Sequence, residues 1–237
     1  MVADVEQLVA ELEARSDFRF AAEGLSKPLA GNRAGTVLVT DMRRALVLAG
    51  FGYHVTVGAL TTPITGGGGD GGVPDITLPE LAIVVPSGTA IMPIRGSIQL
   101  EVPADADAVI VEAFFAADRA SASNASASTG TVETVYNMRT DAPRTTACTV
   151  VSANTVAITA PVHHLELARK QMVTNIVTSG ITQGILDLDY EPKTPPLFVG
   201  PCTVFAHWGS SAGSVTGFAQ FEWVELTAAL GDLFGGN

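Results

Sequence analysis

The feature of this chain that most restricts its fold is a repeated apolar side chain at every second position within short segments. In ILDLDYEP, residues 185–192, two leucines and a tyrosine alternate with acidic side chains, and TGFAQFEWVELT, residues 216–227, alternates in a similar way. Successive side chains of a strand point to opposite faces of a sheet. This period therefore predicts strands with one buried and one solvent-facing side.

Segments of this kind follow one another through most of the chain. From residue 36 onward we count roughly nine to ten of them, with turn signals about every 8 to 15 residues and neither a strand–helix–strand rhythm nor a tandem repeat. Hydrophobic residues make up 47% of the chain, which is enough for a large core. The pattern predicts an all-β fold, a jelly-roll-like β-sandwich, as one domain over residues 36–237.

A different pattern precedes this domain, in residues 1–35. It begins with apolar side chains at helical spacing and acidic side chains between them, and it continues through LSKPLAGNRAGT, whose Pro and Gly residues favour irregular, extended chain. We therefore expect a short amphipathic N-terminal helix followed by an extended arm. The apolar positions of this predicted helix are Val2, Val5, Leu8, Val9 and Leu12.

Three segments are harder to assign. Residues 44–60, RALVLAGFGYHVTVGAL, are rich in β-branched and aromatic side chains and are predicted as strand, although residues 41–49 would also tolerate a helical turn or two. Residues 161–178 fit a helix and a strand equally well. The Ser- and Ala-rich residues 119–131 have little to bury, so we expect a mobile loop there.

Six glycines lie within Gly66–Gly72, and such a run can bind a phosphate or a calcium ion. A phosphate-binding loop needs a lysine, but no Lys or Arg lies between Arg44 and Arg95. The prolines that follow make the helix of a dinucleotide site unlikely to form, and Asp70 is misplaced for a calcium-binding repeat. We expect a flexible excursion between two strands.

Neither catalysis nor a cofactor is predicted, and the chain is interpreted as a non-enzyme. The G-x-S-x-G motif of a nucleophile elbow is absent, and a zinc site needs three or four converging ligands. His163, His164 and Glu166 are candidate metal ligands, and Asp187 and Asp189 are candidate paired carboxylates on the solvent-facing side of a strand. Asp105 and Asp107 are interpreted as turn residues. Cys148 and Cys202 are interpreted as buried apolar thiols.

The charge distribution favours a protein partner over nucleic acid. The net charge of −11 opposes general binding to nucleic acid, yet six of the 13 basic residues lie within the first 44 positions. This segment is either a solvated surface or an arm that docks on an acidic partner. The candidate assembly contacts are Val5, Leu8, Leu12, Arg15, Arg19, Arg33, Arg43 and Arg44.

Two further expectations concern the membrane and the aromatic side chains. No apolar run reaches the roughly 18 residues of a membrane span, and the N-terminus lacks the pattern of a secretory signal. We therefore expect a protein that is made and kept in a reducing compartment, or released by lysis. Tyr190, Trp208 and Trp223 are candidates for a sugar-stacking or interface surface, with burial in the core as the alternative.

In texture the chain resembles the jelly-roll structural proteins of viral particles, in particular the capsid-associated and cement proteins of tailed bacteriophages. The resemblance lies in the charge-poor Ala, Thr, Gly and Val composition, the predicted helix and arm, VVPSGTAIMPIRGSIQLEV at residues 84–102, and PLFVGPCTVFAHWGSSAGSVTGFAQFEWVEL at residues 196–226. It implies a non-enzymatic building block, often a homotrimer, that binds itself and a major capsid protein or other virion proteins. It also implies location in the virion after synthesis in the host cytoplasm.

Other functions remain open at this point. The chain could be a major jelly-roll coat protein that forms the shell, instead of one that decorates it. It could also be a β-sandwich module that binds a carbohydrate or a receptor, with the three aromatic side chains as contacts. A hydrolase on a jelly-roll scaffold is a third reading, which no motif supports.

Overall fold

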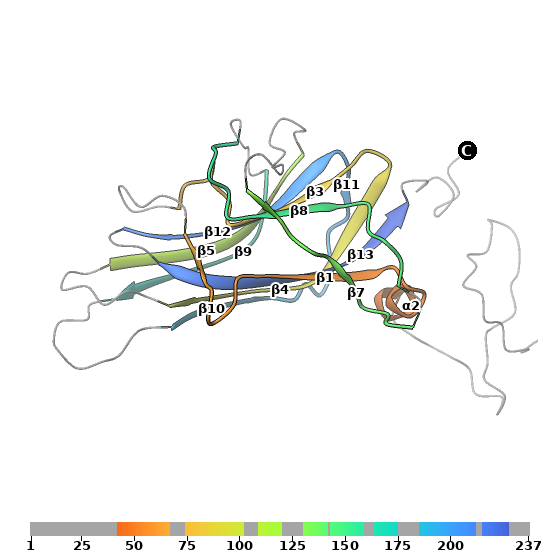
Figure 1. Cartoon of the computed structure of the whole chain (residues 1–237), viewed down its shortest axis with the longest axis horizontal. Coiled ribbons are helices and arrows are strands. Elements are labelled where there is room, and N and C mark those ends of the chain that lie inside the picture. The colour runs from red at the N-terminus through yellow and green to blue at the C-terminus, as the bar shows by residue number, and fades with distance from the viewer. Residues whose placement is uncertain are drawn as a thin grey trace, which may run out of the picture.

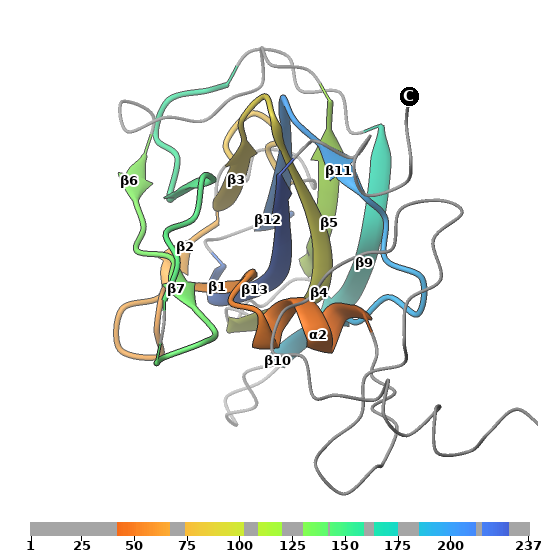
Figure 2. The same ribbon diagram turned by 90° about the vertical axis from the view of Figure 1, so that its right-hand side faces the viewer.

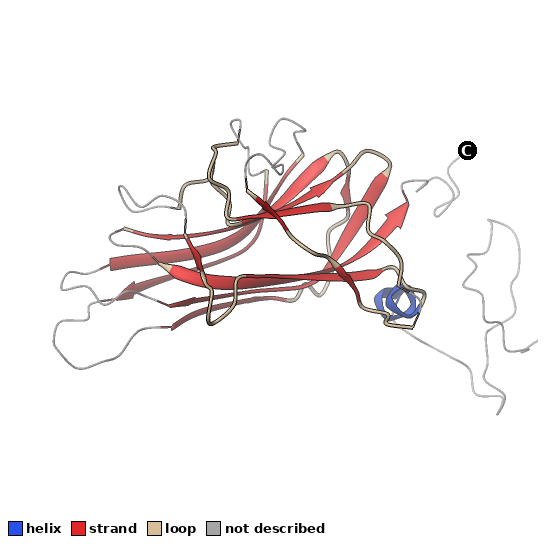
Figure 3. Cartoon of the chain, viewed as in Figure 1, coloured by secondary structure: helices blue, strands red, loops and turns tan. Residues whose placement is uncertain are grey.

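Two antiparallel β-sheets packed face to face make up nearly all of the described structure (Figures 1 and 3). The computed structural model describes residues 42–66, 74–101, 109–119, 130–141, 143–158, 164–174, 185–211 and 215–227. The all-β sandwich predicted from the alternation is therefore confirmed. The predicted N-terminal helix and arm lie outside the described residues, as do residues 67–73 of the glycine run and residues 120–129 of the Ser-rich loop.

The first sheet, called sheet 1 below, has the strand order β10-β4-β13-β1-β7. Two further short strands pair with the ends of its inner strands β4 and β13. Its strands are β10 (Ile185–Tyr190), β4 (Thr89–Glu101), β13 (Thr216–Thr227), β1 (Gly52–Val57) and β7 (Tyr136–Asn137), together with β11 (Phe198–Val199), which pairs with β4, and β2 (Ile64–Thr65), which pairs with β13.

The second sheet, called sheet 2, has the strand order β6-β8-β3-β12-β5-β9. Its strands are β6 (Thr131–Val132), β8 (Thr149–Ser152), β3 (Leu81–Val85), β12 (Cys202–Ser210), β5 (Val109–Asp118) and β9 (Leu165–Thr174). The segment that fitted both a helix and a strand thus contains a strand, β9, which pairs along β5.

The eight longest strands pair with one another in the pattern of a jelly roll. In chain order these strands are β1, β3, β4, β5, β9, β10, β12 and β13. The first pairs with the last, the second with the seventh, the third with the sixth and the fourth with the fifth. This is the pattern of one long antiparallel hairpin wrapped around a core, and β4–β13 and β5–β12 pairing joins the turns into two sheets.

The space between the sheets is filled by large aromatic and aliphatic side chains. Phe115 of sheet 2 meets Phe221 of sheet 1 with ring centroids 5.4 Å apart, and Phe221 lies 6.4 Å from Trp223. All three side chains are fully buried. Gly96 makes this contact possible, because a Cβ there would stand 3.0 Å from both phenylalanine rings. The alternation in β13 thus buries one face, as predicted.

Sheet 2 departs from simple alternation at its centre, because β12 is buried on both faces. On the outer face Phe205 packs against Ala82, Val151 and Ile158. Next to it, His207 stacks on Phe114 with ring centroids 5.0 Å apart. A strand buried on both sides is recognised by continuous hydrophobicity, not by a period of two.

The helix α2 (Met42–Leu48) lies against the outer side of sheet 1, next to β4 and β13 (Figure 2). The strand predicted for the first part of residues 44–60 is therefore wrong, and the helical alternative is right. Its Leu46 is buried in a cluster with Ala90, Val224 and Leu226, which shows why a helix is favoured here. A helix can cover the apolar outer end of the sheet, which a further strand of this short segment could not do.

A glycine cap ends α2. Gly50 adopts a φ of 84°, and its N–H donates to Val47 O over 2.9 Å, while the Phe51 N–H donates to Leu46 O over 2.9 Å. These two bonds form the Schellman motif, which uses a left-handed glycine to satisfy the last carbonyls of a helix. Among the residues that the structure describes, no helix is long and apolar enough to cross a membrane.

The contribution of the central aromatic contact to the free energy of unfolding can be tested by mutation. We expect Phe115→Ala to lower the free energy of unfolding by about 3–5 kcal/mol, because it leaves a cavity where two sheets meet. The matched aromatic substitution at the surface is Tyr136→Ala, where the side chain is 58% exposed, and we expect a loss below about 1 kcal/mol. Urea denaturation measures both, and equal losses would contradict the assignment of the core.

Candidate functional site

The three aromatic side chains proposed as a contact surface lie in the core. Trp208 and Trp223 are completely buried, and Tyr190 is 8% exposed. Burial raises the pKa of the Tyr190 hydroxyl to about 12. Both tryptophans occupy positions of β12 and β13 that face the opposite sheet. The sugar-stacking interpretation is therefore wrong for these residues, and the alternative of burial in the core is correct.

The two thiols are buried and unpaired, as predicted. Cys202 pairs with Val85 on one side of β3, and Cys148 directly precedes Thr149, which pairs with Val84 on the other side. Two strand spacings therefore separate the cysteines, about 9–10 Å, which is more than a disulfide can span. Burial raises the pKa of both thiols, to about 11 for Cys202, and nearby Glu225 raises that of Cys148 further.

The carboxylates of β10 lie on the outer face of sheet 1, as predicted from the alternation. Asp189 forms an ion pair of 3.5 Å with Arg95 of β4, and both side chains are more than half exposed. This contact of Asp189 is a surface bridge of small energy, so it gives no support to paired carboxylate chemistry. Asp105 and Asp107 lie outside the described residues.

The histidine segment before β9 does not gather metal ligands within the described structure. His164 accepts a hydrogen bond of 3.1 Å from the Arg119 N–H through its Nδ1 atom, and His163 lies outside the described residues. No group of three or more His, Cys, Asp or Glu side chains suited to a metal ion occurs in the described ranges.

An ion pair between an exposed arginine and a buried glutamate on the outer face of sheet 2 was not foreseen from the sequence. Arg169 of β9 bonds to Glu112 of β5, which is 5% exposed, and to Glu166 over 2.6 Å. Its guanidinium also lies 4.5 Å from the centre of the Phe114 ring. The hydrogen bonds to Glu166 raise the pKa of Arg169 further. The cluster fastens the edge strand β9 to β5, so we assign it a structural role.

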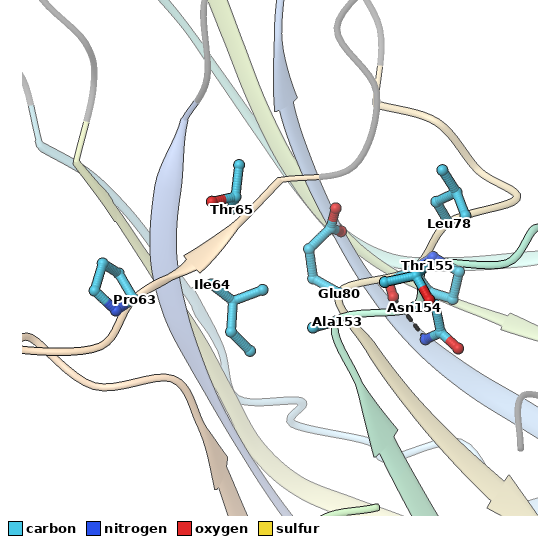
Figure 4. Close-up of a pocket in the computed structure, with 9 residues that line it drawn as sticks. Pro63, Ile64, Thr65, Leu78, Glu80, Ala153, Asn154 and Thr155 are labelled. Atoms are coloured by element: carbon cyan, nitrogen blue, oxygen red, sulfur yellow. Dashed lines mark hydrogen bonds between the residues drawn. The ribbon is translucent and has the colours of Figure 1, made fainter. Parts of the chain in front are cut away.

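A cavity of about 350 Å³ lies beside Glu80, between β2 and the turn after β8 (Figure 4). Glu80 is 2% exposed, and its Oε2 accepts a hydrogen bond of 2.9 Å from the Trp208 N–H. Asn154 donates from Nδ2 to Pro79 O over 2.7 Å. In Figure 4 the Glu80 carboxylate and the Asn154 amide point in different directions. These polar groups join β3, β12 and the turn, and they do not converge on a common ligand position.

The α2 groove is the site that combines predicted contact residues. It is a cavity of about 470 Å³ between the helix α2 and residues of β4, of the segment after β7 and of the segment after β10. A hydrogen bond holds each end of α2. Arg43 donates to Pro192 O over 3.2 Å, and Arg139 donates to Leu48 O over 3.1 Å. The residues that line the groove are Arg43, Arg44, Val47, Leu48, Ile94, Met138 and Glu191.

The groove is apolar with a basic side. Leu48 is 71% exposed, and Val47, Ile94 and Met138 are half-buried. Of the eight predicted assembly contacts, Arg43 and Arg44 thus come together here, while Val5, Leu8, Leu12, Arg15, Arg19 and Arg33 lie outside the described residues. Sequence reasoning missed Ile94, Met138 and Glu191, because only the folded topology brings them to α2.

The described residues define a jelly-roll β-sandwich with a packed interior and a basic, apolar groove on its outside. The chain matches no family model, no curated protein and no solved structure.

The buried thiols give a pH prediction. Cys202 has a pKa of about 11 when folded against an ordinary value of 9.0, so its contribution to stability is complete below pH 9. That contribution is lost as the pH rises from 9 to 11, because only the unfolded chain then loses the proton. We expect Cys202→Ala to reduce the fall in stability across this interval, as measured by urea denaturation at each pH. Identical pH profiles for the two proteins would contradict this assignment.

Proposed function

We propose that this protein is a non-enzymatic virion structural protein, a cement or decoration subunit that oligomerises and binds a capsid shell. The observation that carries the proposal is the complete jelly-roll pairing of eight strands around a filled interior. This fold recurs in viral capsid proteins, in lectins and in cupins. A fold alone does not define a function, so the distribution of buried and exposed groups must support the choice.

The filled interior supports a building block over a barrel that encloses a ligand. Trp208, Trp223 and Phe115 occupy the centre of the sandwich with no exposed surface. In jelly rolls that hold a small molecule or a metal, the inside of the barrel must supply both space and polar ligands. Here the same volume is taken by apolar side chains, so binding is directed to the outer surface.

The outer surface supports contact with a protein partner near α2. Arg43 and Arg44 are the last of the six basic residues within the first 44 positions, and both line a groove with an exposed leucine, Leu48. Arginine beside apolar surface is enriched where proteins bind each other. The proposal places self-association, with a trimer favoured, and the contact with a major capsid protein at this end of the subunit.

The two alternatives stand differently. Carbohydrate or receptor binding has lost its proposed contacts, because Tyr190, Trp208 and Trp223 are buried. A shell-forming coat protein shares the fold and the surfaces of a decorating protein, and the state of the purified protein separates the two. Discrete oligomers in light scattering favour a cement protein, whereas shells in electron micrographs favour a coat protein.

Deleting residues 1–35 tests the proposed assembly role. The truncated chain retains α2, whose Leu46 packs on sheet 1, so we expect it to fold and to keep most of its stability. We expect it to fail to assemble or to decorate particles, as seen by electron microscopy and co-sedimentation with capsids. An arm of this length can supply the interface area of on the order of 1,600 Å² that specific complexes need.

A longer deletion is the matched control. Removing residues 1–50 also removes α2 and uncovers Val224 and Leu226, so that variant should lose stability as well. Normal decoration of particles by the chain without residues 1–35 would show that the arm is not required and would contradict this part of the proposal.

A further inference from the structure

We infer that the α2 groove binds residues 2–13 of the same chain, which gives the free subunit an arm folded back on its own domain. This goes beyond the proposed function, because it concerns where the N-terminal segment is held before any partner is met. It depends on the proposed function only for its consequence, that an arm stored in this way is withheld from neighbouring subunits.

The first support is the chemistry of the groove. Leu48 and Met138 supply apolar surface, and Leu48 is 71% exposed although it belongs to a helix that packs on the sheet. Arg43, Arg44 and Glu191 stand beside this surface, so two positive charges outweigh one negative charge in its lining. Such a groove fits an amphipathic helix that carries acidic side chains, because apolar anchors fill the groove and carboxylates meet the guanidinium groups.

The second support is the sequence of the segment. Val5, Leu8 and Leu12 have the i, i+3 and i+7 spacing of helix anchors in a groove. Residues 2–13 contain four acidic side chains and no Lys or Arg, so their charge is opposite to that of the groove arginines. Arginine binds carboxylates with two parallel hydrogen bonds, which adds orientation to the attraction. The acidic residues are Asp4, Glu6, Glu11 and Glu13.

The third support is connectivity. The described chain begins at Met42, the first residue of α2, so the preceding residues leave from the helix that forms one side of the groove. Residues 14–41 can extend to at most about 100 Å, which is ample for a return to the same helix. A covalent tether between two binding elements gives an effective concentration of up to the millimolar range. Docking on the same chain is thereby favoured over docking on a second copy at micromolar protein.

Site-directed cross-linking tests this inference in the full-length protein. The double variant Val9→Cys, Leu48→Cys places one thiol in the segment and one in the groove, and the native thiols are buried and will contribute little. With a short bis-maleimide at low micromolar protein we expect a cross-linked monomer of changed gel mobility. The control Val9→Cys, Thr56→Cys moves the second thiol to an exposed position of β1 outside the groove and should give at least about fivefold less product.

Mixing the two single variants separates the same chain from a second copy. If Val9→Cys and Leu48→Cys proteins, mixed at the same concentration, give no cross-linked dimer, docking on the same chain is supported. A dimer formed as efficiently as the cross-linked monomer would overturn the inference in favour of docking on a neighbour. Equal cross-linking of the Leu48 and Thr56 positions would also overturn it, because the segment would then show no preference for the groove.

Charge reversal tests the role of the arginines. Adding Arg44→Glu to the Val9→Cys, Leu48→Cys protein should reduce the cross-linked monomer by roughly fivefold, the upper end of what an exposed ion pair contributes. Arg119→Glu, at an exposed arginine after β5, should leave the yield unchanged. Urea denaturation of each variant shows that the domain is intact. An unchanged yield with Arg44→Glu would show that charge does not guide the segment and would overturn the inference as stated.

Binding to particles is measured separately, so that the two hypotheses can fail independently. Loss of specific cross-linking with normal decoration of capsids would overturn the groove inference alone. Specific cross-linking in a protein that binds no capsid would overturn the virion role alone.

Discussion

The fold depends on the position of the last strand, β13, between the first and third strands of the jelly roll. β13 pairs with β1 over Gly52–Val57 and with β4 along the whole of its length. It therefore closes the wrapped hairpin and supplies Phe221 and Trp223 to the core. Because these contacts join residues near both ends of the described chain, the sandwich cannot close until the C-terminal strand is present, and such long-range pairing is slow to form.

The same strand also links the core to the α2 groove. Its inward face ends in the core at Trp223, and the next outward residues, Val224 and Leu226, pack under the helix. Opposite them β4 carries a β-bulge: Glu222 pairs with Arg95 and Trp223 with Pro93, which leaves Ile94 as the extra residue. Proline has no N–H for the ladder, so a bulge is the expected result at this position. The bulge places Ile94 in the groove.

The sequence predicts these features to different degrees. Alternation in residues 185–190 and 216–223 was a reliable guide, because each of these strands has one face on the core and one on solvent. The strand predicted for the segment that forms α2 was wrong, and β12 shows no alternation because it is buried on both faces; in both cases contacts from other parts of the chain decide which side is buried. Trp208 was ambiguous for the same reason. Of the groove only Arg43 and Arg44 could be predicted, since Met138 and Glu191 reach it through pairing that no local pattern encodes.

Charge explains why an acidic segment would select this groove on a chain of net charge −11. A chain of net negative charge repels such a segment on average, and the first described basic residues along the chain are Arg43 and Arg44 on α2. At about 0.1 M salt charges are screened beyond roughly 10 Å, so the arginines act only on a segment already close to them. In the inferred docked state, the covalent connection would provide proximity, the arginines would provide orientation, and burial of apolar side chains against Leu48 would provide most of the stabilisation.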